Sequence, residues 1–417
     1  MKPFQVAIGM DWADEKHAIC VIDREKDTKE SGSLEQTPEA ISDWVNSLRL
    51  RFPDAPIAVC LEQSRGALIY ALMKFEFLTL VPVNPKQLAR FREALGSSGA
   101  KDDPEDAELL AELLVKHGER LREWKPDTEE TRLLTFLNED RRSLVDERTA
   151  LTNRLKSQLK QYFPQALRLC STLHTPLACA LLEHWSSLPE LQQASEEEIR
   201  EFYRKYGRCS EKQLQDRLRI IDNAIPLTTD HAIVKSRQLL VHATVCQIKE
   251  LNKAISEYDG QIETLFTKHT DYQIFKAFPG AGRAMGPRLL SAFGTDRERF
   301  STAADVQCMG GIAPVTRRSG KSKVVLRRWA CNKFLLQTFH EYAAHSIKFS
   351  AWARAYYVMM TERTGAHHAA VRALAFKWIR IMFRCWKDRT LYDESQYLAR
   401  LKSQNSPILK YLASATA

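Results

Sequence analysis

Four carboxylates occupy positions from which they could bind metal ions. Asp11 closes an apolar run over residues 4–10, and Glu62 closes a second apolar run over residues 56–61. Apolar runs of this length, bounded by Pro or charged residues, are typical of buried strands. Asp103 and Asp106 stand three apart at the start of a helical pattern and share one helix face. Two strand-end acids and a helical pair could hold two divalent cations. Two such ions can bind the attacking and the leaving oxygen of a phosphoryl displacement.

The same acids also have a purely structural interpretation. A single Asp at a strand end is commonly a turn former or a helix N-cap. Asp103 precedes Pro104, so Asp103 could be the N-cap and Asp106 a first-turn acid favoured by the helix dipole. For each acid alone, both interpretations stay open. The order strand, strand, helix favours the metal site.

A second stretch with chemical potential lies between Val306 and His340, which contains no acid. Lys and Arg at high density neutralise phosphates, so this stretch is predicted to bind nucleic acid, with a solvated charged surface as the alternative. Ser319 lies within it, and its place beside Gly320 is typical of a turn residue. A serine nucleophile needs activation, and no His–Asp partner is adjacent in the sequence. The stretch contains seven basic residues: Arg317, Arg318, Lys321, Lys323, Arg327, Arg328 and Lys333.

The first part of the chain has the pattern of an α/β domain with a mixed sheet, over residues 1–120. Strands are predicted over residues 6–10, 17–23, 56–61 and 78–83. Helices are predicted over residues 37–50, 66–76, 85–95 and 103–117. Both strand-end acids and the helical pair fall in this domain.

From about residue 128 the pattern becomes helical with heptad spacing. Apolar residues step by 3 and 4 through Ile248, Leu251, Ile255, Tyr258, Ile262 and Leu265, and Leu137, Leu144 and Leu151 are seven apart. These segments predict an antiparallel coiled-coil hairpin over residues 121–270, with either subunit pairing or RNA support as its role, or else an ordinary internal bundle. Residues 166–230 are predicted to form an inserted helical subdomain. Residues 271–417 are predicted to form a mostly helical C-terminal domain.

Composition favours a polyanionic partner and an intracellular place. The formal net charge is +9 and the isoelectric point about 9.0. No apolar stretch approaches the roughly 18–20 residues that a bilayer requires, and no signal peptide is visible. The nine cysteines are scattered without a Cys-x-x-Cys motif, as expected of reduced thiols in a cytosolic protein. We therefore expect a cytoplasmic protein with no membrane partner.

Several motifs together resemble one family of transposases. The run from Ile8 to Ala13 is similar to the opening of RuvC-like domains of the DEDD type, and residues 61–66 resemble the segment of their second acid. Residues 101–107 match the pattern Lys-x-Asp-x-x-Asp-Ala. Gly-Ile-x-Pro at 311–314, followed by Ser-Gly-Lys at 319–321, resembles the C-terminal motif of the same family, the bridge-RNA-guided IS110-type recombinases. One departure is that Arg328-Trp329-Ala330-Cys331-Asn332-Lys333 stands where Lys-x-Gly-Asn is usual.

The resemblance implies an architecture and a function. The architecture is a RuvC-like, ribonuclease-H-like domain, a coiled-coil middle with a helical insert, and a helical transposase domain. The implied function is a DNA transposase and site-specific recombinase, in which Asp11, Glu62, Asp103 and Asp106 bind Mg²⁺, two ions being expected, and Ser319 becomes covalently joined to DNA. The implied partners are target and donor DNA, a structured bridge RNA that pairs with both, and further subunits in a dimer or tetramer, with acids and serine supplied by different subunits. The implied place is the nucleoid-associated cytoplasm of a prokaryote.

Two other classes of protein fit the residues. One is a RuvC-like, metal-dependent junction resolvase or nuclease that uses water as the nucleophile, with Ser319 merely structural. The other is a non-catalytic RNA- or DNA-binding protein whose acids are caps. A covalent protein–DNA adduct separates the first from a serine recombinase, and metal-independent stoichiometric binding would indicate the second.

Overall fold

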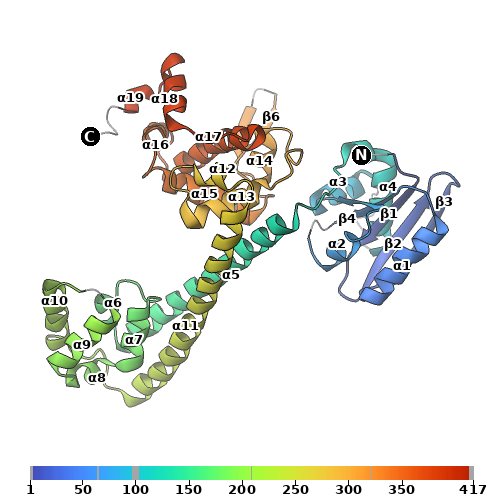
Figure 1. The fold of residues 1–417 in the computed structure, drawn as a ribbon. Coiled ribbons are helices and arrows are strands. Elements are labelled where there is room, and N and C mark those ends of the chain that lie inside the picture. Colours follow the sequence, from blue (N-terminus) through green and yellow to red (C-terminus); the bar gives the residue numbers. More distant parts are fainter. Residues whose placement is uncertain (1–2, 63–64, 96–102, 208, 321, 413–417) are drawn as a thin grey trace. The chain divides into compact units, whose positions relative to one another are not determined.

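The computed structural model describes residues 3–62, 65–95, 103–207, 209–320 and 322–412 (Figure 1). The chain divides into two compact units, Met1–Pro126 and Asp127–Ala417. Each unit has its own buried core, and each is described by itself below.

The first unit is built on a five-stranded sheet in the order β3-β2-β1-β4-β5. Strands β1 and β4 run parallel, as do β4 and β5, whereas β2 is antiparallel to both of its neighbours. The central pair β1 and β4 is fully buried along its apolar residues, as expected of parallel strands covered on both faces. The strands are β1 (Val6–Asp11), β2 (Lys16–Asp23), β3 (Thr28–Glu35), β4 (Ile57–Leu61) and β5 (Leu78–Pro82).

Helices cover both faces of this sheet. Because side chains alternate along a strand, Met10 and its alternate neighbours in β1 pack on one face with α1 and α2. Ala7 points to the other face, where Ala58 and Cys60 of β4 pack with apolar residues of α3 and α4. The helices are α1 (Pro38–Arg51), α2 (Ala67–Leu72), α3 (Pro85–Leu95) and α4 (Asp103–His117), followed by the short 3₁₀ turn η1 (Gly118–Arg120).

The predicted mixed α/β domain is confirmed, with one strand that the sequence did not indicate. Strands β1, β2, β4 and β5 and helices α1 to α4 lie within a few residues of the predicted ranges. Strand β3 was missed because its sequence, Thr-Lys-Glu-Ser-Gly-Ser-Leu-Glu, is polar, and only Leu34 of the strand is buried. An exposed edge strand carries no apolar alternation, so hydrophobic periodicity cannot reveal it.

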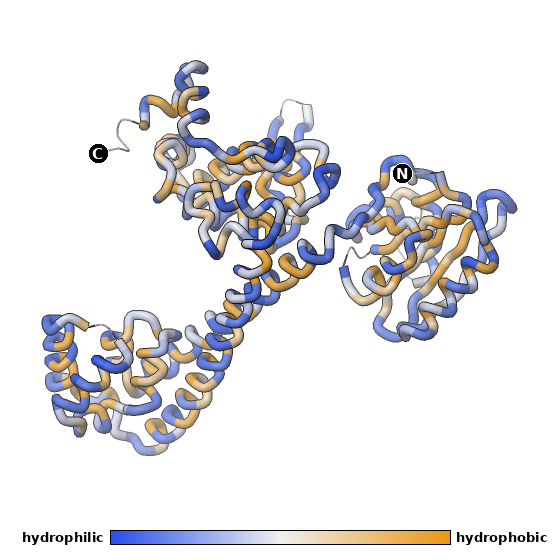
Figure 2. The backbone as a smooth tube through the Cα atoms, viewed as in Figure 1, coloured by the Kyte–Doolittle hydropathy of each residue, from blue (hydrophilic) through white to orange (hydrophobic). Residues whose placement is uncertain are grey.

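The second unit contains a pair of long antiparallel helices, α5 (Glu129–Tyr162) and α11 (His231–Lys268). Their direction follows from two bonds, one between the Arg141 guanidinium and Asp259 and one between Arg148 and Asn252. The predicted apolar seam on α11 faces α5, and Ile255 in its middle is only 4% exposed. In Figure 2 apolar residues recur along both helices between hydrophilic ones. The helical pairing was therefore predicted from the heptad spacing.

Short helices between α5 and α11 form a compact insert with its own core. Leu155 and Leu159 of α5 and Val241 and Val245 of α11 pack against apolar residues of these helices. The insert therefore lies at the end of the helix pair where α5 finishes and α11 begins. In the described residues it comprises α6 (Ala166–Leu169), α7 (Pro176–His184), α8 (Leu188–Gln193), α9 (Glu196–Tyr206) and α10 (Glu211–Asp222).

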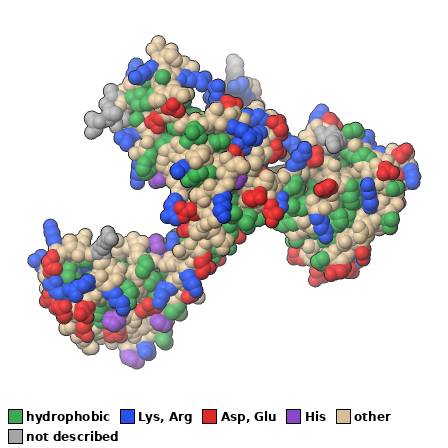
Figure 3. Space-filling view, in the orientation of Figure 1, with side chains coloured by type: hydrophobic (Ala, Val, Ile, Leu, Met, Phe, Trp, Pro, Cys, Tyr) green, Lys and Arg blue, Asp and Glu red, His purple; other side chains and the backbone are tan. Residues whose placement is uncertain are grey.

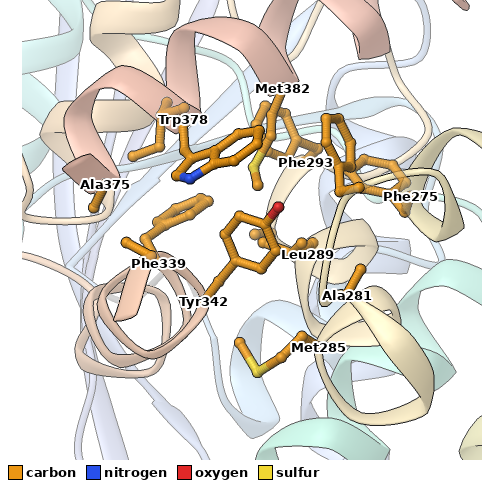
Figure 4. Close-up of a cluster of buried hydrophobic side chains, with 14 of the residues drawn as sticks. Phe275, Ala281, Met285, Leu289, Phe293, Phe339, Tyr342, Ala375, Trp378 and Met382 are labelled. Atoms are coloured by element: carbon orange, nitrogen blue, oxygen red, sulfur yellow. The ribbon is translucent and has the colours of Figure 1, made fainter. Parts of the chain in front are cut away.

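The remaining helices gather around the other end of the pair and enclose an aromatic core. In Figure 4 Tyr342 and Trp378 lie beside Phe293 and Phe339, and the Tyr342 and Trp378 ring centroids are 5.4 Å apart. Leu134 of α5 belongs to this core as well. The helices are α12 (Tyr272–Lys276), α13 (Gly282–Phe293), α14 (Ala303–Met309), α15 (Lys333–Ser346), α16 (Ala351–Thr364), α17 (His367–Asp388), α18 (Glu394–Ser403) and α19 (Leu409–Leu412).

One element of this helical region is not a helix. Strands β6 (Val315–Ser319) and β7 (Ser322–Leu326) form an antiparallel two-stranded sheet. This hairpin is absent from the elements predicted from the sequence. All nine cysteines of the chain are free thiols. In the part of the chain that the structure describes, no helix is both long and apolar enough to cross a bilayer.

Candidate active site

Asp11 and Glu62 end neighbouring parallel strands and point to the same face of the sheet. The register pairs Met10 with Leu61, so Asp11 is the last residue of β1 and Glu62 the first after β4, at one level. Met10 faces α1 and α2, and alternation therefore turns Asp11 to the opposite face, the face of α4. The same argument applied to Leu61 turns Glu62 to that face.

The pKa of a neighbouring thiol supports the orientation of Glu62. Cys60 lies on the α4 face of β4. Burial raises the pKa of the Cys60 thiol, and the negative charge of Glu62 raises it further. Residues two apart on a strand point the same way, so both observations place the Glu62 carboxylate on the face that α4 covers.

Helix α4 brings Asp106 to this face by an unusually close approach to β1. A Cβ atom on Gly9 would lie 1.9 Å from the Ala107 carbonyl oxygen and 2.4 Å from the Ala111 nitrogen, so only glycine allows this contact. Asp106 immediately precedes Ala107 and is 2% exposed. The glycine two residues before Asp11 therefore positions the helix that carries the third carboxylate.

Asp106 is paired with a cation that the sequence analysis did not single out. The Arg92 guanidinium, from α3, forms an ion pair with the Asp106 carboxylate. The Asp106 side chain is 3% exposed and that of Arg92 25%. The Arg92 Nε atom is buried and has no hydrogen-bond partner among the described residues. A buried carboxylate is stable only with such a partner, so Arg92 compensates the negative charge of Asp106.

The fourth predicted acid cannot be placed with the others. Asp103 is the first residue of α4, but its side chain lies outside the described residues. Within the described residues, no three His, Cys, Asp or Glu side chains form a group that could hold a metal ion. Asp11, Glu62 and Asp106 carry carboxylates, and carboxylate oxygen is the ligand type that Mg²⁺ takes in proteins.

His17 orders the segment that follows Asp11, a role that the sequence did not suggest. The side chain is fully buried, and its Nδ1 accepts a hydrogen bond from the Ala13 amide at 3.1 Å. The Nε2 atom must then carry the proton that it donates to Gln36. Burial lowers the pKa of His17, and a ring whose Nδ1 accepts a hydrogen bond is the neutral form. A histidine at the start of an apolar strand was the only sequence signal.

Ser319 lies at the tip of the β6–β7 hairpin in the second unit. It pairs with Ser322 across the ladder, and Gly320 in the turn has a φ of +54°. Positive φ favours glycine at this point of a two-residue turn. Ser319 is exposed, and within the described residues no hydrogen bond to its hydroxyl is formed. The described residues of its hairpin therefore present the hydroxyl without a hydrogen-bonded base.

The basic residues of the hairpin divide between its two faces. Arg317 pairs with Val324, and Arg318 with Lys323. Opposite residues of an antiparallel pair share a face, so Arg317 lies on the face of Ser319, and Arg318 and Lys323 lie together on the other. Like charges placed directly opposite are destabilising. No described carboxylate pairs with them, and a bound polyanion would compensate this repulsion.

The other predicted cations have more local roles. The Arg328 Nε atom donates to the Ala313 carbonyl at 3.1 Å, and the Lys333 ammonium donates to the Trp329 carbonyl at 2.8 Å. Arg327 is exposed and lies over the Trp329 ring. Lys321 lies outside the described residues. Across the visible face of the molecule, Lys and Arg alternate with acids (Figure 3), so the acid-free stretch around Ser319 is distinct in charge from that surface.

Comparison with known proteins identifies the class of both halves. A family model described as a transposase, of the DEDD type found in IS110 elements, matches residues 8–164. A second model, described as the transposase IS116/IS110/IS902 family, matches residues 272–358. The first match spans the four acidic positions and the second spans Ser319. The chain is thus a transposase, an enzyme that acts on DNA. Its family is that of the IS110 elements.

Individual relatives agree with this assignment. The chain is 28% identical over 411 residues to a candidate transposase of the IS117 mini-circle of Streptomyces coelicolor, covering 95% of this chain and 97% of the relative. It is 25% identical over 299 residues to a 43.6 kDa protein of the element IS110 from the same organism, covering 70% and 72%. A 42 kDa protein of the element IS900 of Mycobacterium paratuberculosis is 30% identical over 166 residues, covering 39% and 42%.

Proposed function

We propose that this transposase cuts and rejoins DNA strands to move an insertion sequence, using metal-binding carboxylates and a serine nucleophile. The observation that supports this most directly is the arrangement of Asp11, Glu62 and Asp106. Two carboxylates end adjacent parallel strands, and the third projects from the helix packed on that face. Capping would account for each acid alone, but it gives no reason for two strand ends and the neighbouring helix of the same sheet face each to carry an acid. A RuvC-like, ribonuclease-H-like fold is part of the proposal, and the sheet order β3-β2-β1-β4-β5 agrees with it.

The carboxylates would hold Mg²⁺, and two ions are proposed. The proposed ligands are Asp11, Glu62, Asp103 and Asp106, and the position of the first two at the ends of neighbouring strands supports this choice. Such ions, when bound, offset the negative charge that develops on a phosphate during strand transfer. For Asp106 to take part, its carboxylate must separate from Arg92.

Ser319 would attack a phosphodiester and become joined to one DNA end. The bond from Oγ to phosphorus forms while the bond from phosphorus to a sugar oxygen breaks. The hydroxyl loses its proton and the departing sugar oxygen gains one. Arg317, on the face of Ser319, would stabilise the charge on the attacked phosphate. Rejoining is the same exchange with a sugar hydroxyl as the attacking group.

The partners proposed are donor and target DNA and a structured bridge RNA that pairs with both. Base pairing would then select the sequence, and the protein would contact the backbone, as in other guided systems. We also propose that the acids and the serine of one reaction come from different subunits of a dimer or tetramer. The protein is proposed to work in the cytoplasm of a prokaryote, beside the nucleoid.

A covalent adduct on a denaturing gel tests the serine mechanism. Wild-type protein incubated with Mg²⁺, guide RNA and nicked, labelled DNA should give a shifted band, and Ser319→Ala should give none. Ser322→Ala is the matched control, because Ser322 pairs with Ser319 across the same exposed hairpin, and it should give the band. Recombination by wild type with no band, even on nicked substrate, would instead favour the nuclease that uses water.

Complementation tests the shared site. Asp11→Ala and Ser319→Ala proteins are each expected to be inactive. Their mixture should recover partial activity if one subunit supplies the acids and another the serine, because some sites would then contain both intact sets. A mixture as inactive as its parts would place the acids and serine of each site in one chain.

A further inference from the structure

Trp329 is the exposed tryptophan of this chain. Its residue surface is 67% exposed, whereas the other seven tryptophans are buried or half-buried. It follows strand β7 and precedes α15, so it lies close in the chain to the hairpin that carries Ser319. An isolated indole exposed to water is a large apolar surface without a partner, and tryptophans in such positions are commonly binding residues.

Hydrogen bonds fix the backbone on either side of Trp329, while most of the residue is exposed to water. Asn332 caps α15 by accepting from the Leu335 amide at 3.0 Å, and the Asn332 amide itself donates to the Met309 carbonyl at 3.1 Å. Arg328 is tied to the Ala313 carbonyl. These bonds on either side fix the main chain at residues 328–332. The ring therefore projects from an ordered support, which lowers the entropy that a ligand must overcome on binding.

Positive charges surround the ring. The Arg327 guanidinium lies 4.6 Å from the centroid of the ring, and the Lys333 ammonium 6.0 Å from it. Arg372 of α17 adds a charge nearby, since burial and then the positive Arg327 lower its pKa. The Arg372 Nε atom is buried without a hydrogen-bond partner. None of these cations forms an ion pair with a described carboxylate, and the chain from Val306 to His340 contains no acid.

We propose that the Trp329 ring is a stacking platform for an unpaired nucleobase, with Arg327 contacting the phosphate beside that base. The inference rests on the proposed function, because a strand that is cut and exchanged must expose unpaired bases. An aromatic face flanked by cations matches an unpaired nucleotide in both shape and charge. A second copy of the chain fits less well, since a basic surface repels itself.

Full-length protein with a fluorescent base analogue tests the proposal. The probe is a short DNA duplex with one unpaired 2-aminopurine, compared with the same duplex fully paired. All variants carry Ser319→Ala, so that no strand is cut. Protein with Trp329 should quench the probe and prefer the unpaired base. Trp329→Ala should abolish the quenching and lower that preference by about fivefold to 150-fold, as expected for one lost base–aromatic stack. Trp329→Phe should retain part of both.

Tyr206→Ala is the matched control. Tyr206 is 42% exposed and has the Lys205 ammonium 5.1 Å from its ring, but it lies in the insert. This variant should quench like the parent protein. A parallel probe made of RNA shows which nucleic acid supplies the stacked base. The base is assigned to the nucleic acid, DNA or RNA, whose probe loses its quenching in Trp329→Ala. Either result supports the proposal.

Two results would overturn the stacking role. One is unchanged quenching and preference in Trp329→Ala with both probes. The other is unchanged quenching with a lower sedimentation coefficient, which would assign the ring to contacts between copies. The readout is independent of strand cleavage, so its failure leaves the serine adduct untouched. Conversely, the absence of an adduct with wild-type protein would refute the serine mechanism, and it would not affect the stacking result.

Discussion

At the scale of single residues, the ion pair between Arg92 and Asp106 governs what the carboxylate group can bind. Asp106 is almost completely buried, and its charge is compensated by a guanidinium from another helix. Removing one partner of a buried ion pair leaves the other charge unpaired, at a cost of about 3–5 kcal/mol. A divalent cation could supply the missing positive charge. If the proposed metal site exists, Arg92 and a metal ion would compete for this one carboxylate.

Arg92→Ala should therefore lower the melting temperature without metal and enlarge the rise in melting temperature when Mg²⁺ is added. The measurement is a thermal melt with and without Mg²⁺, with Arg90→Ala as the control. Arg90 is exposed on the same helix α3 and forms no ion pair with a described residue, so its removal should leave both quantities unchanged. A Mg²⁺ response equal to that of wild type would show that Asp106 does not bind the ion.

His17 makes stability depend on pH. Burial lowers its pKa below the ordinary value of 6.5, so the unfolded chain binds a proton that the folded chain refuses. The free energy of unfolding should be at its full value above pH 6.5 and decrease as the pH falls below it. The glutamine in His17→Gln does not titrate, so the free energy of unfolding of this variant should decrease less steeply as the pH falls. Urea unfolding at a series of pH values measures this slope. An identical slope would mean that His17 is not a main source of the dependence.

At the scale of elements, the contact between β1 and α4 positions Asp106. Gly9→Ala would place a methyl group within 1.9 Å of the Ala107 carbonyl oxygen, and backbone atoms cannot yield cheaply. The variant should lose several kcal/mol of stability, which is at the upper end for single substitutions. Denaturant unfolding measures this loss. Gly32→Ala in β3 is the control, because its Cβ would be 3.6 Å from the nearest atom, and it should melt like wild type.

The sequence predicted the elements whose signal is local or periodic. Buried strands β1 and β4 and the heptad seam on α11 were found because apolar spacing reveals them. The acids were identified by their place at the ends of such elements. Arg92 could not be identified, because an arginine on an amphipathic helix looks like any solvated charge until the fold brings Asp106 against it. The hairpin at Ser319 had a signal that was missed, a Gly-containing two-residue turn beside the β-branched pair Val324 and Val325.

At the scale of the whole molecule, each unit has its own core, and the two should respond separately to core substitutions. Ile255→Asp puts a charge into the seam between α11 and α5, where the native side chain is 4% exposed. It should cost several kcal/mol and lower the melting transition of the second unit. In calorimetry, Ile255→Asp should not move the melting transition of the first unit, which is the transition that Gly9→Ala should shift. A single shared transition that moves in both variants would show that the units unfold together.

The core around Trp378 combines residues from distant points of the chain. Leu134, at the start of α5, packs in the same cluster as Ile408, close to the last described helix. During synthesis, a chain emerges from its N-terminus and domains fold as they are completed. The sheet unit and the insert can therefore fold on the ribosome, while Leu134 waits for nearly the whole chain. This core is therefore completed last, so a prematurely ended translation product would have an ordered sheet unit and insert but would lack the finished core of the C-terminal helices.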